Sequence, residues 1–312
     1  MNVLFIVLGL LLLIIGGNWL LKAAVGFSVV LKIPKIVIGM TVVSFATSIP
    51  ELIVSVKSAL DGHADLALGN VMGSNIANLG LVLAITILIS TISIEKGFYK
   101  TDWPVMIIST VLLYAFIAFD GVLQRYEGII LVSFLIIFLI FLLKFQKPAV
   151  VDESPEDDEA LPLNKGILLL AIGGLALWGG SELLIDGAIG IATKFDVSER
   201  IIGITIVSVG TSIPELAASV IAILKKEKAI SLGNLVGSNV FNILAVLGIT
   251  SIITPIKVVD QGLLTNDIFW MLGISILVLP LIFVPIKMKL SWKEGIVLLF
   301  LYVTFIYRML IN

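Results

Sequence analysis

Two glutamates lie in strongly apolar stretches of the chain, and the same short motif surrounds both. Glu51 lies in GMTVVSFATSIPEL, and Glu215 lies in the second copy, GITIVSVGTSIPEL. Glu51 and Glu215 are 164 positions apart, and we call this spacing the repeat offset. An ionised carboxylate at the centre of a bilayer costs roughly 2.5–3.5 kcal/mol even on the milder insertion scales. Because the chain carries this cost twice, beside prolines and hydroxyl groups, we expect the two segments to build an ion site.

The prolines of the motif explain how such a site could acquire further oxygen ligands. Pro50 and Pro214 cannot donate a backbone hydrogen bond, and their rings crowd the carbonyls of Ala46 and Gly210. We therefore expect each TSIPE segment to offer free carbonyls, two hydroxyls and a carboxylate. Ca²⁺ takes roughly six to eight oxygen ligands, so two glutamates would need such neutral oxygens beside them. The alternative is a simple helix kink in which Ser and Thr bond back to the preceding turn.

A second motif repeats with the same repeat offset, as GNVMGSNIAN at 69–78 and GNLVGSNVFN at 233–242. Because one offset fits both motifs, the whole segment is duplicated. Its glycines predict close packing of transmembrane helices. In each copy the first, second and last of its polar members share one helical face, and the polar set suits either a cation path or interhelical hydrogen bonding. These members are Asn70, Ser74, Asn75 and Asn78 in the first copy, and Asn234, Ser238, Asn239 and Asn242 in the second.

Composition identifies an all-α integral membrane protein. The mean hydropathy is +1.16, and only 13% of the residues are charged, against roughly 25% in soluble domains. There are no cysteines, which excludes disulfides and thiolate metal sites. Apolar runs between charged and Gly/Pro breaks predict ten transmembrane helices. The expected spans are 3–25, 36–58, 67–91, 104–119, 127–145, 165–192, 200–223, 230–253, 267–285 and 294–311.

Five spans fall in each half, and five is odd, so the two repeats must enter the membrane in opposite directions. We expect a first five-helix repeat at 1–145, a linker at 146–164 and an inverted five-helix repeat at 165–312. Alternate connections hold 14 of the 20 Lys and Arg residues, and the opposite side holds six. The positive-inside rule then places both termini outside the plasma (inner) membrane and the linker in the cytoplasm.

Two polar stretches outside the spans could bind metal. Six acidic residues lie within Asp152–Glu159 of the linker. They predict a solvated connection, with a regulatory calcium loop as the alternative, although the turn glycine and alternating ligands of an EF-hand are missing. His63, the one histidine, lies in the loop DGHAD, where a solvated turn is the simpler interpretation than a metal site.

At its repeated segments the chain resembles the calcium/cation antiporter superfamily, and within it the prokaryotic sodium/calcium exchangers. The GTSxPE and GSNxxN segments are similar to the alpha-repeats of that family, with Ala46 where the family commonly has glycine. The resemblance extends over the ten spans, the acidic linker and the inverted halves. Proton/calcium exchangers typically carry another pattern around their glutamates, which favours sodium as the driving ion.

The resemblance also implies which residues bind the ions. Glu51 and Glu215 would bind calcium and sodium, and Asn78 and Asn242, at the end of the second motif, would belong to the metal site as well. Potassium-dependent relatives usually have aspartate where this chain has Asn242, which argues against potassium. Hydroxyl and carbonyl oxygens would complete the calcium site and the flanking sodium sites. These come from Thr47, Thr211, Ser48, Ser212, Ser74, Ser238, Ser44 and Ser208.

We therefore expect a secondary antiporter that exchanges cytoplasmic calcium for external sodium and is not an enzyme. A potassium-dependent or proton-driven calcium antiporter is the alternative within transport. A channel is a further class, but the duplication within one chain favours alternating access. An intramembrane enzyme and an ATP-driven pump lack their motifs, since HExxH, GxSxG and GK[ST] loops are missing. Calcium, sodium and the bilayer are the expected partners, with no cofactor, nucleic acid or obligatory protein partner.

Overall fold

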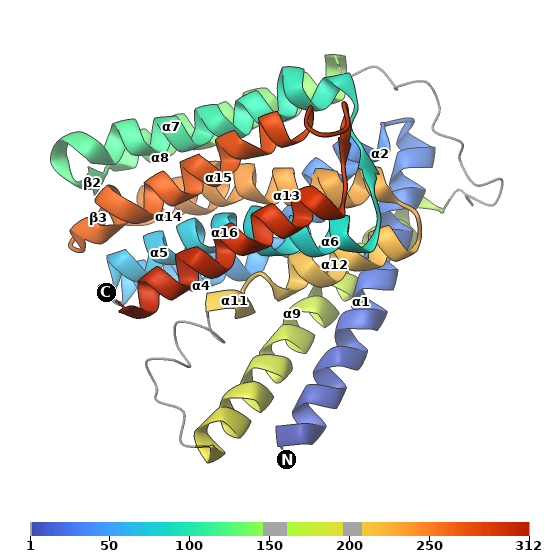
Figure 1. Cartoon of the computed structure of the whole chain (residues 1–312), viewed down its shortest axis with the longest axis horizontal. Helices are drawn as coiled ribbons and strands as arrows, with labels where there is room; N and C mark the ends of the chain where they lie inside the picture. The colour runs from blue at the N-terminus through green and yellow to red at the C-terminus, as the bar shows by residue number, and fades with distance from the viewer. Residues whose placement is uncertain (1, 146–160, 196–207, 312) are drawn as a thin grey trace. The chain divides into compact units, whose positions relative to one another are not determined.

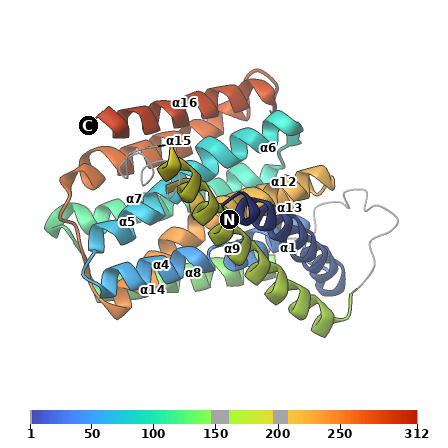
Figure 2. The ribbon, with the colours of Figure 1, turned by 90° about the horizontal axis from the view of Figure 1, so that it is seen from below.

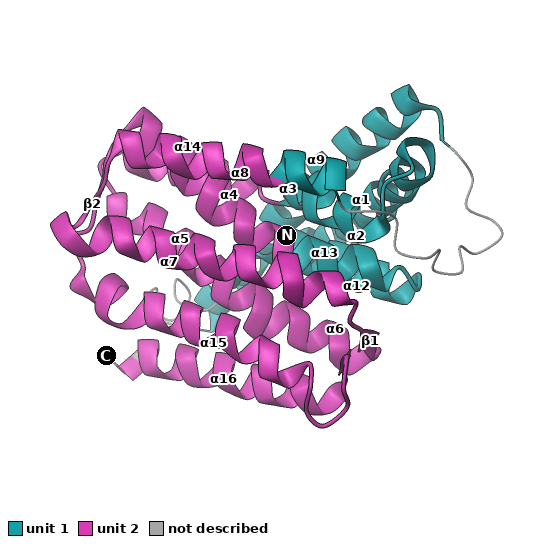
Figure 3. Ribbon diagram, turned by 90° about the horizontal axis from the view of Figure 1, so that it is seen from above, with its two compact units in different colours: residues 1–47, 139–235 teal, residues 48–138, 236–312 magenta. Residues whose placement is uncertain are grey.

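The computed structural model describes residues 2–145, 161–195 and 208–311. Within these ranges the chain is helical apart from turns and four two-residue strands (Figure 1). Residues 146–160 of the predicted linker, with its acidic run, lie outside the described residues, as do residues 200–207 of the predicted span 200–223. The chain divides into two compact units, and each unit combines segments from both halves of the sequence (Figure 3).

Unit 1 comprises Met1–Thr47 and Leu139–Leu235. Its helices include the π-helical segment η1, which leads into the first TSIPE motif. In chain order they are α1 (Asn2–Leu31), α2 (Lys35–Ile38), η1 (Gly39–Val43), α3 (Ser44–Thr47), the end of α8 (Arg125–Phe145), α9 (Leu163–Lys194), α11 (Ser208–Gly210), α12 (Ile213–Leu224) and the first part of α13 (Lys228–Phe241).

The helices α1 and α9 lie side by side in unit 1 (Figures 1 and 2). Glycines allow this close approach. A Cβ atom added to Gly9 would lie 2.7 Å from the carbonyl oxygen of Gly180, and one added to Gly16 would lie 2.8 Å from that of Gly173. Gly173 and Gly180 follow Gly9 and Gly16 by the repeat offset, so the crossing is itself built from repeated positions.

Unit 2 comprises Ser48–Phe138 and Val236–Asn312. Two of its π-helical segments, η2 and η5, begin at the last asparagine of each GSNxxN motif. Its helices are α4 (Ile49–Leu60), α5 (Ala64–Ala77), η2 (Asn78–Leu83), α6 (Ala84–Ile89), η3 (Phe98–Asp102), α7 (Trp103–Asp120), most of α8 (Arg125–Phe145), the end of α13, η5 (Asn242–Leu247), α14 (Gly248–Ile253), η6 (Leu263–Asp267), α15 (Ile268–Leu281) and α16 (Trp292–Ile311).

Two short antiparallel strand pairs connect loops within unit 2. β1 (Ile92–Ser93) pairs with β4 (Lys289–Leu290), and β2 (Val122–Leu123) pairs with β3 (Ile256–Lys257). Among the helices, α15 packs against α7, α5 and α16. These contacts cover α5, on which most residues of the first copy of the second motif are buried.

The described residues contain seven helical segments that are long and apolar enough to cross a membrane, so the prediction of a helical, multi-pass membrane protein is confirmed. The count rises to eight if Lys35–Thr47 and Ile49–Leu60 form one broken span. The ten-span count stays a prediction. The seven segments are Asn2–Leu31, Ala64–Ile89, Phe98–Asp120, Arg125–Phe145, Leu163–Lys194, Lys228–Ile253 and Leu263–Leu281.

Prolines accompany two of the differences between predicted and observed helices. The predicted span 36–58 is broken at Ser48, two residues before Pro50. The predicted span 267–285 ends at Leu281, one residue after Pro280, and Pro285 disfavours a helical conformation at Val284 in the remaining predicted part. The packing prediction for the repeated glycines holds for Gly233, where an added Cβ would clash with the backbone oxygen of Ile36, whereas a Cβ added to Gly69 would have one described neighbour within 4 Å, Leu263 Cδ2 at 3.9 Å.

Candidate functional site

Both copies of the TSIPE motif form a helix break with the same backbone geometry. Ser48 lies between α3 and α4 with φ −87° and ψ 2°, and Ser212 lies between α11 and α12 with φ −87° and ψ 3°. Pro50 and Pro214 occupy the first turn of the following helix, where a missing N–H leaves no intrahelical carbonyl unpaired. Each repeated glutamate therefore lies in the first turn of a new helix, where the helix dipole favours negative charge.

The carbonyl of Gly210 differs from the prediction. We expected it to be free for an ion, but it accepts a hydrogen bond of 2.8 Å from the hydroxyl of Ser181, a buried residue of α9. Gly17 precedes Ser181 by the repeat offset and occupies the matching position, so the first copy has no such hydroxyl. A single serine in an apolar run gave no sequence signal for this contact, which joins residues 29 positions apart.

Unit 1 contains a polar cluster built on α3, α12 and α13. The Ser44 hydroxyl donates to the backbone carbonyl of Asn234 at 2.9 Å, and the Thr47 hydroxyl lies 3.2 Å from Asn234 Oδ1. Asn234 Nδ2 in turn donates to Ser219 Oγ at 3.0 Å. Thr47 also lies within hydrogen-bonding reach of the Glu215 carboxylate. The sequence-predicted residues Ser44, Thr47 and Glu215 are thus brought together by an asparagine from the second motif.

Glu215 is fully buried in this cluster. Its side chain is 0% exposed, and among the described residues neither carboxylate oxygen has a hydrogen-bond partner of good geometry. The hydroxyl of Ser212, also buried, is in the same situation. A buried carboxylate needs a hydrogen bond, a counter-charge or a metal ion to offset its lost hydration. Thr211 is half-buried beside Ser212, and Ser208 begins α11.

Unit 2 repeats part of this arrangement around Glu51, which is also 0% exposed. Asn70 Nδ2 donates to Ser55 Oγ at 3.1 Å and lies 3.4 Å from the backbone oxygen of Glu51. Asn70 and Ser55 are the repeat counterparts of Asn234 and Ser219, so both pairs keep one geometry. The Ser48 hydroxyl is buried without a hydrogen-bond partner among the described side chains and backbone.

Sequence reasoning assigned no role to Ser55 and Ser219. A signal existed, because each serine lies four residues after its glutamate, so the repeat offset also separates the two serines. Residues four apart share a helical face, so these serines lie on the same side of α4 and α12 as the carboxylates.

The second motif forms a buried asparagine network within unit 2. The amide of Asn75 donates to the backbone carbonyl of Asn239 at 3.1 Å, and that of Asn239 donates to the backbone carbonyl of Asn75 at 3.3 Å. Asn78 Nδ2 donates to Asn239 Oδ1 at 3.1 Å, and Asn242 Nδ2 donates to Asn75 Oδ1 at 3.0 Å. Interhelical hydrogen bonding, one of the two interpretations of this motif, therefore occurs.

The oxygens of Asn78 and Asn242 remain outside this network. Both side chains are 0% exposed, and across the described parts of the chain neither Oδ1 has a hydrogen-bond partner. Each residue is the first of a π-helical segment, a feature that often marks functional positions. Ser74 and Ser238, on α5 and α13, are buried as well.

The donor atoms of both clusters are oxygens. In residues 2–145, 161–195 and 208–311, no group of three or more His, Cys, Asp and Glu side chains could hold a metal ion. Carboxylate, hydroxyl and amide oxygens suit hard cations such as Ca²⁺ and Na⁺, while zinc and copper favour nitrogen and sulfur. The oxygens of the clusters therefore suit a hard cation better than zinc or copper.

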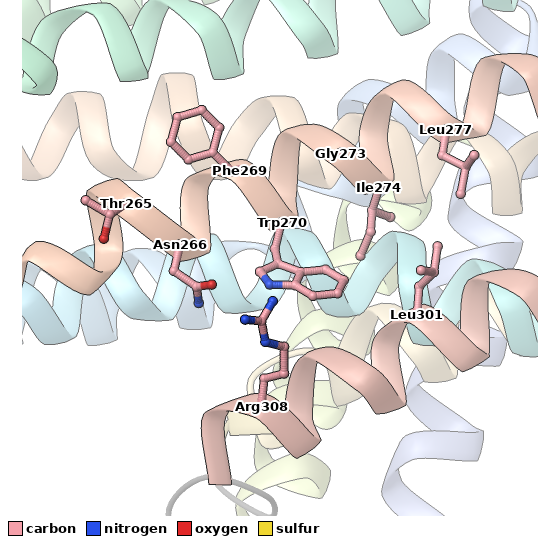
Figure 4. A pocket seen from close by; sticks show the side chains of 9 residues that line it. All are labelled: Thr265, Asn266, Phe269, Trp270, Gly273, Ile274, Leu277, Leu301 and Arg308. Carbon is pink, nitrogen blue, oxygen red and sulfur yellow. The ribbon is translucent and has the colours of Figure 1, made fainter. Parts of the chain in front are cut away.

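Two surface cavities do not fit such a cation. The first, of about 440 Å³ between α15 and α16, is lined by apolar side chains with Thr265 and Asn266, and its charged residue is Arg308, which repels cations (Figure 4). The second, of about 460 Å³, contains His63 and Asp65. The Asp65 carboxylate already accepts the backbone N–H groups of Val259 and Asp260 at 2.8 and 3.0 Å, so it serves the turn.

Comparison with known proteins identifies the family. The family described as "Sodium/calcium exchanger protein" matches residues 1–144 and 165–311. The chain is 36% identical over 313 residues to the putative antiporter CaxA of Alkalimonas amylolytica, covering 97% of each chain. It is 30% identical over 346 residues to the sodium/calcium exchanger MaX1 of Methanosarcina acetivorans, covering 98% of this chain and 97% of the relative.

A solved structure of the sodium-calcium exchanger NCX_Mj, soaked with Na⁺ and Ca²⁺, matches the fold with a TM-score of 0.81. The identity is 30%, and the match covers 98% of this chain and 97% of that one. These matches are to transporters and not to enzymes. The chain belongs to the sodium/calcium exchanger protein family.

Proposed function

We propose that this protein is a secondary antiporter that exchanges cytoplasmic Ca²⁺ for extracellular Na⁺ by alternating access, moving net charge in each cycle. The observation that carries the proposal is a set of buried oxygens at repeated motif positions that have no hydrogen-bond partner of good geometry among the described residues. They belong to Glu215, Ser212, Ser48, Asn78 and Asn242. Such oxygens in packed helices are costly unless a cation uses them.

The ligands divide by charge. Glu51 and Glu215 supply the two negative charges that a divalent ion requires, and neutral oxygens complete its shell and the flanking sodium sites. We assign the neutral role to hydroxyls, amide oxygens and backbone carbonyls of both motifs. They are those of Thr47, Thr211, Ser48, Ser212, Ser74, Ser238, Asn78, Asn242, Ser44 and Ser208.

The proposal includes ten transmembrane helices in two inverted repeats, at 1–145 and 165–312, joined by a cytoplasmic linker at 146–164. Both termini would lie outside the plasma (inner) membrane, as the distribution of basic residues favours. Inverted repeats support alternating access because the two repeats can exchange conformations around a central site. No cofactor or obligatory protein partner is required, since the sodium gradient supplies the free energy.

The test is calcium flux in proteoliposomes under separately imposed sodium, potassium and proton gradients. An outward-directed or inward-directed sodium gradient alone should drive calcium in the opposite direction. Calcium movement that requires protons or potassium would replace the proposal by the corresponding antiporter. Calcium flux with no counter-ion requirement would indicate a channel.

A further inference from the structure

The four asparagines of unit 2 have side-chain orientations that can be deduced from the network itself. A carboxamide has an oxygen that accepts and a nitrogen that donates, and which atom lies where must be assigned from its partners. Two members of the network, Asn75 and Asn239, face backbone carbonyls. A carbonyl can only accept, so the atom that faces it must be the nitrogen.

This assignment fixes the next pair. With the nitrogen of Asn75 on the Asn239 carbonyl, the oxygen of Asn75 is the atom left to face Asn242, and it accepts the Asn242 nitrogen at 3.0 Å. By the same argument, the oxygen of Asn239 accepts the Asn78 nitrogen at 3.1 Å. The nitrogens of Asn242 and Asn78 are therefore held inside the network, and their oxygens must point away from it.

The orientation matters because a carboxamide has two chemically opposite ends. An oxygen presented to a cation attracts it, while an amide nitrogen with its two hydrogens repels it. The oxygens of Asn78 and Asn242 are buried, and they have no partner in the described parts of the chain. Without a fixed partner for its nitrogen, each amide could turn over and close the ion path.

We propose that Asn75 and Asn239 are positioning residues that hold Asn242 and Asn78 as oxygen-only ligands of the transported cation. The pairing crosses between helices, since Asn75 on α5 holds Asn242, which follows α13 as the first residue of η5, and Asn239 on α13 holds Asn78, which follows α5 as the first residue of η2. This inference rests on the proposed function. It adds that two neutral residues which do not contact the ion determine its affinity through their neighbours.

The crossed pairing gives a specific test by double-mutant cycles. We would measure the Kd for Ca²⁺ of the purified full-length protein by titration calorimetry. Asn75→Leu keeps the branched shape of the side chain but removes both polar atoms. It should raise the Kd roughly tenfold, the range of one lost hydrogen bond. Asn242→Ala should also raise the Kd, and adding Asn75→Leu to it should have little further effect, because the ligand that Asn75 positions is gone.

The matched control for this double-mutant cycle pairs Asn75 with Asn78, the asparagine whose side chain Asn75 does not hold. Asn75→Leu combined with Asn78→Ala should multiply the two effects, because Asn75 does not hold Asn78. In the equivalent cycle for the other pair, the effect of replacing Asn239 on the Kd should depend on whether Asn78 is present. It should not depend on whether Asn242 is present. A residue that only packs the helices would lower the unfolding temperature without this crossed pattern of coupling in the Kd.

Each outcome decides between the alternatives. Coupling in the two crossed pairs, Asn75 with Asn242 and Asn239 with Asn78, supports the proposal. If the free-energy effects of the two substitutions simply add in every pair, the proposal is wrong. If Asn75→Leu does not fold, Asn75→Ser serves in its place, and failure of every such variant would assign both asparagines to helix packing alone. Failure of the proposed function is distinguishable, because the unmodified protein would then neither bind calcium nor exchange it for sodium.

Discussion

The replacement Glu215→Gln tests the role of the buried carboxylate most directly. Glutamine has almost the same shape, so the change removes one negative charge and adds an amide nitrogen. Glu215 is 0% exposed, so little water is available to replace the lost charge. We expect the variant to fold, since it no longer buries an ionisable group, and to bind calcium poorly.

The expected magnitude follows from Coulomb's law. At about 4 Å and an effective dielectric constant of about 20, a carboxylate attracts a monovalent cation by about 4 kcal/mol and a divalent one by about twice as much. Part of this is offset because glutamine costs less to bury. A net loss of about 3 kcal/mol for calcium corresponds to a Kd on the order of 100-fold higher. The loss for sodium should be smaller than about tenfold in Kd, because the carboxylate attracts a monovalent cation only half as strongly and the same offset applies.

Titration calorimetry with calcium and with sodium measures both losses in the same preparation. Glu294→Gln is the matched control, because Glu294 is 3% exposed but its carboxylate accepts the N–H and O–H groups of Ser291 at 2.6 and 2.7 Å. A glutamine oxygen can accept the same bonds, so calcium affinity should stay within about twofold of the unmodified protein. A folded Glu215→Gln protein that keeps its calcium affinity, or that loses affinity for both ions equally, would refute the reasoning.

Three further predictions concern the helix break, the driving ion and voltage. Ser181→Ala leaves the buried Gly210 carbonyl without its hydroxyl donor, and it should cost about 1–3 kcal/mol in the free energy of unfolding measured in detergent. An unchanged free energy would show that this bond is dispensable. Because residue 242 is a neutral asparagine, replacing potassium by choline should change sodium-driven calcium flux by less than about twofold, the scale of non-specific ion effects. A flux that vanishes in choline would indicate potassium dependence. Exchange of three sodium ions for one calcium would move one charge, worth roughly 2.3 kcal/mol per 100 mV, so valinomycin-clamped negative potentials should accelerate sodium entry. Flux and final gradient that both ignore voltage would indicate electroneutral exchange.

Much of the fold could be predicted because the membrane imposes simple length rules. Apolar runs located the long helices, and Pro50 and Pro214 located the two breaks. The π-helical segments at Asn78 and Asn242 could not be predicted, since an extra residue in a helical turn leaves no mark on composition. The grouping of both sequence halves into each compact unit also has no local signal, because it depends on which helices pack together.

The candidate site was predictable to the extent that it is repeated. A single offset identified both glutamates, both helix breaks and the motif asparagines. The Ser181 contact breaks the repeat, because Gly17 occupies the matching position, and it was therefore missed. Asn75 was visible as a polar member of its motif. Its partners lie on another helix, and sequence spacing alone cannot say which carbonyl its amide reaches.

The burial of Glu215 has a consequence for leakage. When it is ionised and binds no ion, the carboxylate is an isolated charge in a medium of low dielectric constant, and burying such a charge costs several kcal/mol. Any conformational change that keeps it buried must therefore wait until a cation or a proton neutralises it. In the proposed antiporter, a carrier whose carboxylate stays ionised would rarely return without a bound cation, so one ion would seldom run down its gradient unless the other moved in exchange. The buried carboxylate proposed to attract the ion would thus also keep the two fluxes coupled.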